Sequence, residues 1–155
     1  MAQYYELIIY TASLSKYAEP LMQQMDTNRY CTGALFREHC TFMNGIFVKD
    51  LSRVGRPLKD LMIVDNSPTA YMLQPECAIP ILSWYDDMKD KCLMELAPLL
   101  IELSKVPDVR ACIPRFTRNN IINYPMAMKV VGEVLARESK ITTIDHEIGD
   151  KVESV

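Results

Sequence analysis

The feature that most constrains this chain is a continuous apolar run, Leu61-Met62-Ile63-Val64, that stops abruptly at Asp65-Asn66-Ser67-Pro68. An uninterrupted apolar run of this length is typical of a parallel strand covered on both faces. A similar run within Glu6 to Tyr10 stops at Thr11-Ala12-Ser13. Short buried strands that alternate with helical segments predict an α/β fold with a parallel sheet flanked by helices.

The other segments are consistent with this layout. Asn44-Gly45 between alternating residues predicts a β-hairpin that delivers Lys49 at its far end. Pro80 has no amide to donate, which predicts an edge position for the strand Ala78 to Leu82. Helices are predicted from Pro20 to about Asp26, from Lys91 to about Lys105 with Asp90 as the cap, and from Pro125 to about Ser139. A loop or broken helix is predicted over Leu51 to Asp60, and a linker over Arg115 to Asn120. The second of these helices is expected to carry an apolar stripe formed by Leu93, Leu96, either Leu99 or Leu100, and Leu103.

Length and charge limit the classes of protein. The 155 residues, 49% of them apolar with a net charge of -3, match one globular domain and not a disordered chain. A pI near 5.4 argues against direct nucleic-acid binding. The apolar runs are too short to span a membrane, and Met1 to Tyr5 lacks the basic and apolar regions of a signal peptide.

Five scattered cysteines indicate a reducing compartment, and nuclear or cytoplasmic residence is the expectation. A zinc site from Cys31, His39 and Cys40 lacks the usual paired spacing. His39 and Cys40 are also unsuited to act as base and nucleophile, because adjacent residues on a strand point to opposite faces. The thiols are therefore predicted to be buried or half-buried.

Three groups at strand ends suit phosphate chemistry, because ligands bind outside the carboxyl ends of an open parallel sheet. The Thr11 hydroxyl can hydrogen-bond a phosphoryl oxygen, Lys49 can neutralise its charge, and Asp65-Asn66 carry the oxygen ligands that Mg²⁺ prefers. Each has a simpler alternative: Thr11 as a cap, Lys49 as a solvated charge, and Asp65-Asn66-Ser67-Pro68 as a turn.

The order of these groups resembles motifs two, three and four of the haloacid dehalogenase superfamily. Within it, the chain is similar to the small phosphatases of the RNA polymerase II carboxy-terminal domain type, the NLI-interacting-factor-like family. Five short sequence segments carry the resemblance: Tyr10 to Ala18, Leu35 to Cys40, Val48 to Arg53, Val64 to Pro68 and Ser83 to Asp87. The whole resemblance covers roughly Tyr5 to Arg115.

The resemblance implies roles for these positions in a Mg²⁺-dependent protein serine/threonine phosphatase. Thr11 would hydrogen-bond the transferring phosphoryl group, and Lys49 would stabilise the phosphoaspartate. Asp65 would hold Lys49 and support the metal shell, while Asn66 would ligate Mg²⁺. The implied partner is a phosphorylated Ser or Thr in a protein segment.

Three further positions are implied to bind that substrate. Arg37 matches an arginine near the substrate phosphate; its alternative is a surface charge at a strand edge. Leu14 and Tyr17 match positions that line an apolar pocket for a neighbouring substrate side chain. Plain core packing is their alternative.

The family's first motif, Asp-x-Asp-x-Thr/Val, does not occur in the chain, and Asp86-Asp87 matches a later family position. In the family, the first Asp of that motif attacks phosphorus and the second is the general acid and base. Residues 1–113 are therefore expected to be the C-terminal part of a catalytic domain without its first strand. Residues 114–155 are expected to be a linker, one helix and an acidic tail that frays from Ile141 to Val155.

Three explanations are open for the missing motif: a truncated active phosphatase, an inactive pseudophosphatase that acts as a protein-binding module, or an unrelated α/β protein. The first is favoured, and the five matching segments argue against the third. A missing central strand would leave an apolar sheet edge uncovered, which predicts self-association of this chain.

Overall fold

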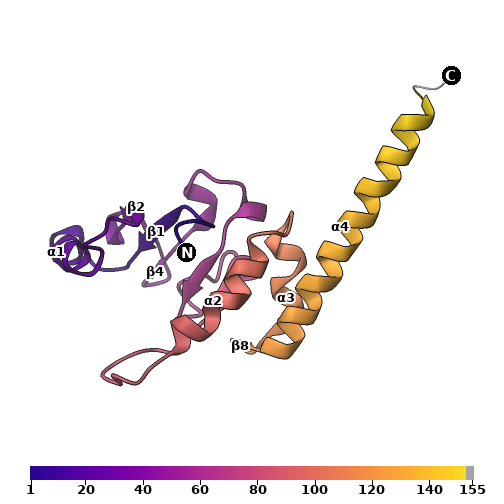
Figure 1. Ribbon diagram of the computed structural model, residues 1–155. Coiled ribbons are helices and arrows are strands. Elements are labelled where there is room, and N and C mark those ends of the chain that lie inside the picture. The colour runs from indigo at the N-terminus through magenta and orange to yellow at the C-terminus, as the bar shows by residue number, and fades with distance from the viewer. Residues whose placement is uncertain (153–155) are drawn as a thin grey trace.

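Two pairs of parallel strands, two antiparallel hairpins and a helical layer make up the computed structural model, a mixed α/β fold (Figure 1). The structure describes the backbone of residues 1–152 and the side chains of residues 1–139. The strands are β1 (Leu7–Tyr10), β2 (Cys31–Leu35), β3 (Thr41–Met43), β4 (Ile46–Val48), β5 (Ile63–Asp65), β6 (Ala78–Pro80), β7 (Thr117–Arg118) and β8 (Ile121–Ile122). The helices are α1 (Ser15–Met25), α2 (Cys92–Leu103), α3 (Ile113–Phe116) and α4 (Tyr124–Val152).

The first parallel pair is β1 with β2, joined by α1. The strand predicted before Thr11 is confirmed. The predicted start of the helix at Pro20 is wrong, because α1 begins at Ser15 and Pro20 lies inside it. The earlier start is stabilised by a residue distant in sequence: the Glu38 carboxylate accepts hydrogen bonds from the Ser15 amide (3.2 Å) and hydroxyl (3.0 Å). Such a tertiary cap leaves no local sequence signal.

The hairpin predicted at Asn44-Gly45 is confirmed as β3 and β4. Both turn residues have positive φ, 50° at Asn44 and 80° at Gly45, which explains why this dipeptide is required there. The chain then passes Lys49 and forms two short 3-10 helices, Leu51–Arg53 and Leu58–Asp60, so the expected broken helix is also confirmed.

The second parallel pair is β5 with β6. Pro80 pairs at the end of β6, which has a strand neighbour on one side alone, as its missing amide predicts. The two parallel pairs are not joined, however: β1–β2 and β5–β6 are separate two-stranded sheets. The single parallel sheet expected from the sequence is thus present as two halves.

The largest core cluster lies between α2 and the C-terminal helices. Leu96, Leu99 and Leu103 of α2 are each 1% exposed and pack in one cluster with Val130 and Val131 of α4. The predicted leucine stripe is confirmed at these three positions and wrong at Leu93, which is 64% exposed. The predicted cap is displaced by one residue: α2 begins at Cys92, so Lys91 is its N-cap, although the Asp90 carboxylate accepts a hydrogen bond from the Cys92 amide.

The segment predicted as a linker is instead structured. Arg115 and Phe116 end α3, and residues 117–122 form the small hairpin β7–β8. Its turn, Asn119-Asn120, takes positive φ at both positions (51° and 58°), a conformation that Asn tolerates better than most residues. The helix predicted from Pro125 is confirmed within α4, which extends away from the body of the molecule (Figure 1). The tail predicted to fray from Ile141 to Val155 instead continues as the helical backbone of α4 as far as Val152, and residues 153–155 lie outside the described part.

All five cysteines are free thiols: Cys77 and Cys112 are buried, and Cys31, Cys40 and Cys92 are half-buried. This confirms the packing predicted for them. Burial raises the pKa of Cys77 to about 11, so this thiol is protonated at neutral pH. Within the described residues, no helix is both long and apolar enough to cross a bilayer.

Replacing Leu99 with Ala tests the α2–α4 core. Loss of a fully buried leucine leaves a cavity, so we expect the free energy of unfolding to fall by roughly 2 to 5 kcal/mol in urea denaturation. Met94, on the same helix, is 73% exposed, and Met94→Ala should change stability by less than about 0.5 kcal/mol. Equal effects of the two substitutions would contradict this core assignment.

Candidate functional site

The centre of the candidate site is an ion pair between Lys49, after the hairpin, and Asp65, at the end of β5. The Lys49 Nζ donates to Asp65 Oδ2, and the two side chains are 12% and 6% exposed. The Asp65 Oδ1 accepts a second hydrogen bond from the Ser67 amide at 2.8 Å. A charged pair withdrawn from water this far is stabilised by its geometry and its added hydrogen bonds.

Two neighbours hold Lys49 in place. Its backbone amide donates to the Ala70 carbonyl at 2.7 Å, which joins the end of the hairpin to the loop after β5. Its ammonium also lies 5.9 Å from the centre of the Tyr10 ring, at the end of β1. Burial is the main cause that raises the pKa of Tyr10 to about 12, so the phenol keeps its proton and donates to the His39 carbonyl at 3.0 Å.

The loop that follows β1 is held by Thr11 and Arg37. The Thr11 amide donates to the Leu35 carbonyl of β2, and its Oγ1 accepts from the Ser13 amide at 3.1 Å. The Arg37 Nε donates to the Ala12 carbonyl at 2.6 Å, and its guanidinium lies 5.0 Å from the centre of the Phe47 ring. Arg37 therefore lies beside the Thr11 loop, in a 3-10 helix (Arg37–His39) instead of at a strand edge.

Leu14 and Tyr17 lie at the start of α1, next to this loop. Leu14 is half-buried and precedes the helix, and its carbonyl accepts the Tyr17 amide. The Tyr17 ring is 67% exposed, which rules out core packing for it, and the Lys16 ammonium lies 4.8 Å from its centre. The two residues are thus near Thr11 in the chain and available to a ligand at the surface.

Asn66 is the candidate metal ligand, adjacent to Asp65. Its Nδ2 donates to the Ser83 Oγ at 2.8 Å, which orients the side chain and leaves Oδ1 as its metal-binding atom. Mg²⁺ usually takes one or two protein ligands and completes its shell with water and phosphate oxygens. The residues at this strand end therefore fit a magnesium ion, although no group of three or more His, Cys, Asp or Glu side chains gathers among the described residues.

The structure therefore brings Asp65, Lys49 and Tyr10 together through two side-chain contacts, and Asn66 and Thr11 follow Asp65 and Tyr10 directly in the chain. Sequence reasoning missed Tyr10, Ser83 and Glu38 as parts of this site, although all three lie within the segments that carry the family resemblance. Hydrogen bonds from its own amide and from Ser15 lower the pKa of Glu38, which keeps it ionised as the cap of α1.

Comparison with known proteins places this sequence in a family. Residues 1–110 match the family model described as NLI interacting factor-like phosphatase. A probable C-terminal domain small phosphatase of Dictyostelium discoideum is 51% identical over 120 residues, which cover 77% of this chain and 39% of that protein.

Two human relatives give the same result. The carboxy-terminal domain RNA polymerase II polypeptide A small phosphatase 2 is 47% identical over 109 residues, covering 70% of this chain and 40% of the relative. The CTD small phosphatase-like protein is 46% identical over 115 residues, covering 74% and 42%. The chain thus spans about two fifths of the length of these relatives.

A double-mutant cycle tests the Lys49–Asp65 pair. Lys49→Met leaves a buried carboxylate without its counter-charge, and we expect the free energy of unfolding to fall by roughly 3 to 5 kcal/mol. Adding Asp65→Leu should restore part of this loss, because both charges are then removed. Lys105 forms an exposed pair with Glu102, so Lys105→Met should cost no more than about 1 kcal/mol. Additive effects of the Lys49 and Asp65 substitutions in urea denaturation would show that the pair is not coupled.

Proposed function

Because the chain belongs to the NLI interacting factor-like phosphatase family, we propose that it forms the phosphoryl-binding part of a magnesium-dependent protein serine/threonine phosphatase. The observation that carries the proposal is the Lys49 ammonium, held by the buried Asp65 carboxylate where β1 and β5 end. A cation fixed in a largely dehydrated position stabilises negative charge that develops nearby, without reorganisation.

Each residue of the site has a proposed task. Lys49 neutralises charge on the phosphoryl oxygens, and Asp65 is a positioning residue that holds Lys49. The Thr11 oxygen already accepts the Ser13 amide, so its hydroxyl hydrogen is the group that donates to a phosphoryl oxygen. Asn66 would hold Mg²⁺ through Oδ1. When bound, the ion would shield the charge between the substrate phosphate and an attacking carboxylate.

No residue of this chain is proposed as the nucleophile. In the aspartyl-phosphate mechanism that the family implies, an Asp carboxylate attacks phosphorus, the Ser or Thr alcohol leaves with a proton from an acid, and water then hydrolyses the acyl phosphate. No Asp-x-Asp pair occurs in the 155 residues. The residues Thr11, Lys49 and Asp65 therefore bind and orient the phosphoryl group, and turnover requires a carboxylate from elsewhere.

The proposed substrate is a phosphorylated Ser or Thr in a flexible protein segment. Arg37 would contact the phosphate, while Leu14 and the exposed Tyr17 would contact an adjacent apolar side chain. The names of the human relatives refer to a carboxy-terminal domain, and the polypeptide of RNA polymerase II appears in one of them. Nuclear or cytoplasmic residence fits such a substrate and belongs to the same proposal.

Phosphopeptide binding tests the role of Lys49. In isothermal titration calorimetry with Mg²⁺, we expect a phosphoserine peptide to bind and its unphosphorylated form not to bind. Lys49→Ala removes a charge-assisted contact, so affinity should fall about tenfold or more, whereas the exposed Lys105→Ala should leave it unchanged. Circular dichroism checks that each variant is folded.

Two outcomes would overturn this assignment. Equal binding of both peptides, or unchanged binding in Lys49→Ala, would remove Lys49 from the phosphate site. Turnover of p-nitrophenyl phosphate by this chain that is lost in Lys49→Ala would show that the chain holds its own nucleophile, against the division proposed above.

Magnesium titration tests Asn66. We expect Mg²⁺ to tighten phosphoserine-peptide binding to the native chain and to have little effect in Asn66→Ala, because that substitution removes the ligand oxygen. Asn28 lies in an exposed turn, so Asn28→Ala should keep the full magnesium effect. A magnesium effect that survives in Asn66→Ala would refute the ligand role.

A further inference from the structure

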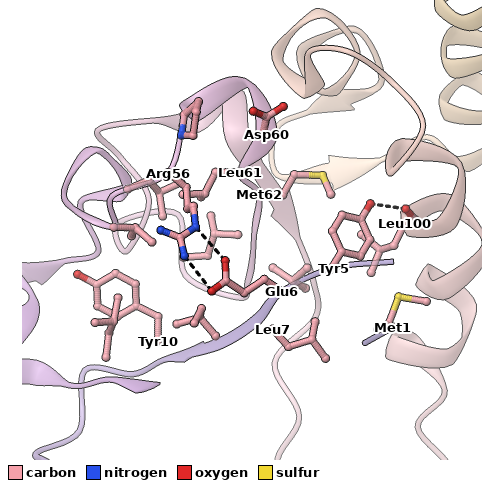
Figure 2. A pocket seen from close by; sticks show the side chains of 17 residues that line it. Met1, Tyr5, Glu6, Leu7, Tyr10, Arg56, Asp60, Leu61, Met62 and Leu100 are labelled. Atoms are coloured by element: carbon pink, nitrogen blue, oxygen red, sulfur yellow. Dashed lines mark hydrogen bonds and ion pairs between the residues drawn. The ribbon is translucent and has the colours of Figure 1, made fainter. Parts of the chain in front are cut away.

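A cleft separates the two parallel pairs of strands. Its volume is about 510 Å³, and β1 and the segment 61–64 leading into β5 line it. Figure 2 shows Glu6, Leu7 and Tyr10 along one wall and Leu61 and Met62 along the opposite wall. The lining is predominantly apolar, as is the environment of a central strand in a sheet covered on both faces.

The backbone of β1 presents a free edge to this cleft. The Thr11 amide donates to the Leu35 carbonyl, so the backbone groups of Thr11 point toward β2. Peptide groups of successive strand residues point to opposite sides, and the register from Ile8 to Tyr10 is regular. The N–H and C=O groups of Ile8 and Tyr10 therefore point away from β2, into the cleft that both residues line.

The same reasoning applies to β5. The Ile81 amide donates to the Asp65 carbonyl, so the backbone groups of Asp65 point toward β6. By alternation, those of Val64 point the other way, into the cleft that Val64 lines. Two open strand edges thus flank one apolar space.

The two edges also run in compatible directions. Tyr10 ends β1 and Asp65 ends β5, and both side chains contact the single ammonium group of Lys49. The carboxyl ends of the two strands are therefore together. One extended segment can then pair in parallel with both strands, using the amide and carbonyl groups that alternate along its two sides.

We propose that this cleft is an acceptor site for an added strand: an extended apolar segment of four or five residues that binds parallel to β1 and β5 and joins the two sheets into one, in the order β2, β1, added strand, β5, β6. Recognition is through the backbone of Ile8, Tyr10 and Val64, and the apolar walls receive the side chains. The proposal concerns strand binding and stands independently of the proposed phosphatase function.

One contact partly occupies the cleft and has to adjust. Arg56 reaches across to Glu6, with Nε and Oε2 2.9 Å apart (Figure 2). Both side chains are about half exposed, 57% and 45%, and an exposed pair of this type contributes little to stability. Its displacement by an incoming strand is therefore a minor cost compared with several new backbone hydrogen bonds.

A labelled model peptide tests the site. We expect the fluorescein-labelled peptide Lys-Val-Ile-Val-Leu-Lys to bind the full chain, measured by fluorescence anisotropy. The matched peptide Lys-Val-Pro-Val-Leu-Lys lacks one central amide hydrogen, so its affinity should be lower by a factor of about ten or more. Equal affinity of the two peptides would indicate general apolar adhesion and overturn the proposal, as would no binding of either.

Amide exchange places the peptide on the predicted edges. With the peptide bound, hydrogen–deuterium exchange followed by NMR should slow at the Ile8, Tyr10 and Val64 amides. The Thr11 and Ile81 amides already donate within the two sheets and should change little, which provides an internal control. The assignment would be overturned if exchange did not slow at the three cleft amides, or if it slowed equally at the two control amides.

A protein variant separates the backbone from the side chain. Val64→Pro removes the amide that faces the cleft, and Val64→Ala keeps it, so we expect the first to weaken peptide binding about tenfold relative to the second. Sedimentation velocity addresses a second copy as the occupant. A dimer of this chain that the peptide dissociates supports a shared strand site. A dimer that excludes the peptide altogether overturns the proposal.

Discussion

The arrangement of this molecule depends on one buried ion pair. Lys49 follows the β3–β4 hairpin and Asp65 ends β5, and the contact between them fixes the hairpin to the second pair of strands. The same ammonium lies against Tyr10, at the end of the first pair. The proposed anion site depends on this single cation, which is held, nearly dehydrated, where both halves of the parallel structure end.

This pair also explains why the polar loops hold their conformation. The Ser67 amide donates to the Asp65 carboxylate, the Ala70 carbonyl accepts from the Lys49 amide, and the Arg37 side chain donates to the Ala12 carbonyl, so a backbone group of each loop is held by a hydrogen bond. Loops on such a frame keep their side chains near a productive position, which reduces the ordering that ligand binding requires. The family match over residues 1–110 and the connected geometry therefore support the same interpretation.

Sequence patterns predicted the parts of the fold that are locally encoded. The Asn44-Gly45 turn, the apolar run into β5 and the Pro80 edge each follow from the conformational limits of one or two residues. The start of α1 was mispredicted because its cap, Glu38, comes from a distant segment. The linker prediction failed at Asn119-Asn120, because two positive φ values in succession produce a hairpin there. Thr11, Lys49 and Asp65 could be predicted as candidates because strand ends carry chemistry, whereas the position of Tyr10 beside Lys49 depends on a tertiary contact that the sequence does not reveal.

The division of the sheet follows from the same constraint. Parallel strands are normally covered on both faces and paired on both edges, yet β1 and β5 each pair on one side alone. Helical packing against the α2–α4 core involves the second pair, because Ile79 of β6 lies within that core, whereas the first pair is connected to α2 by Tyr5, which precedes β1 and donates to the Leu100 carbonyl. A strand in the cleft would connect the well-packed half to the half that carries Thr11 and Arg37. Because the groups proposed to bind phosphate come from both halves, filling the cleft would also fix their separation, so strand binding and phosphate binding should stabilise each other.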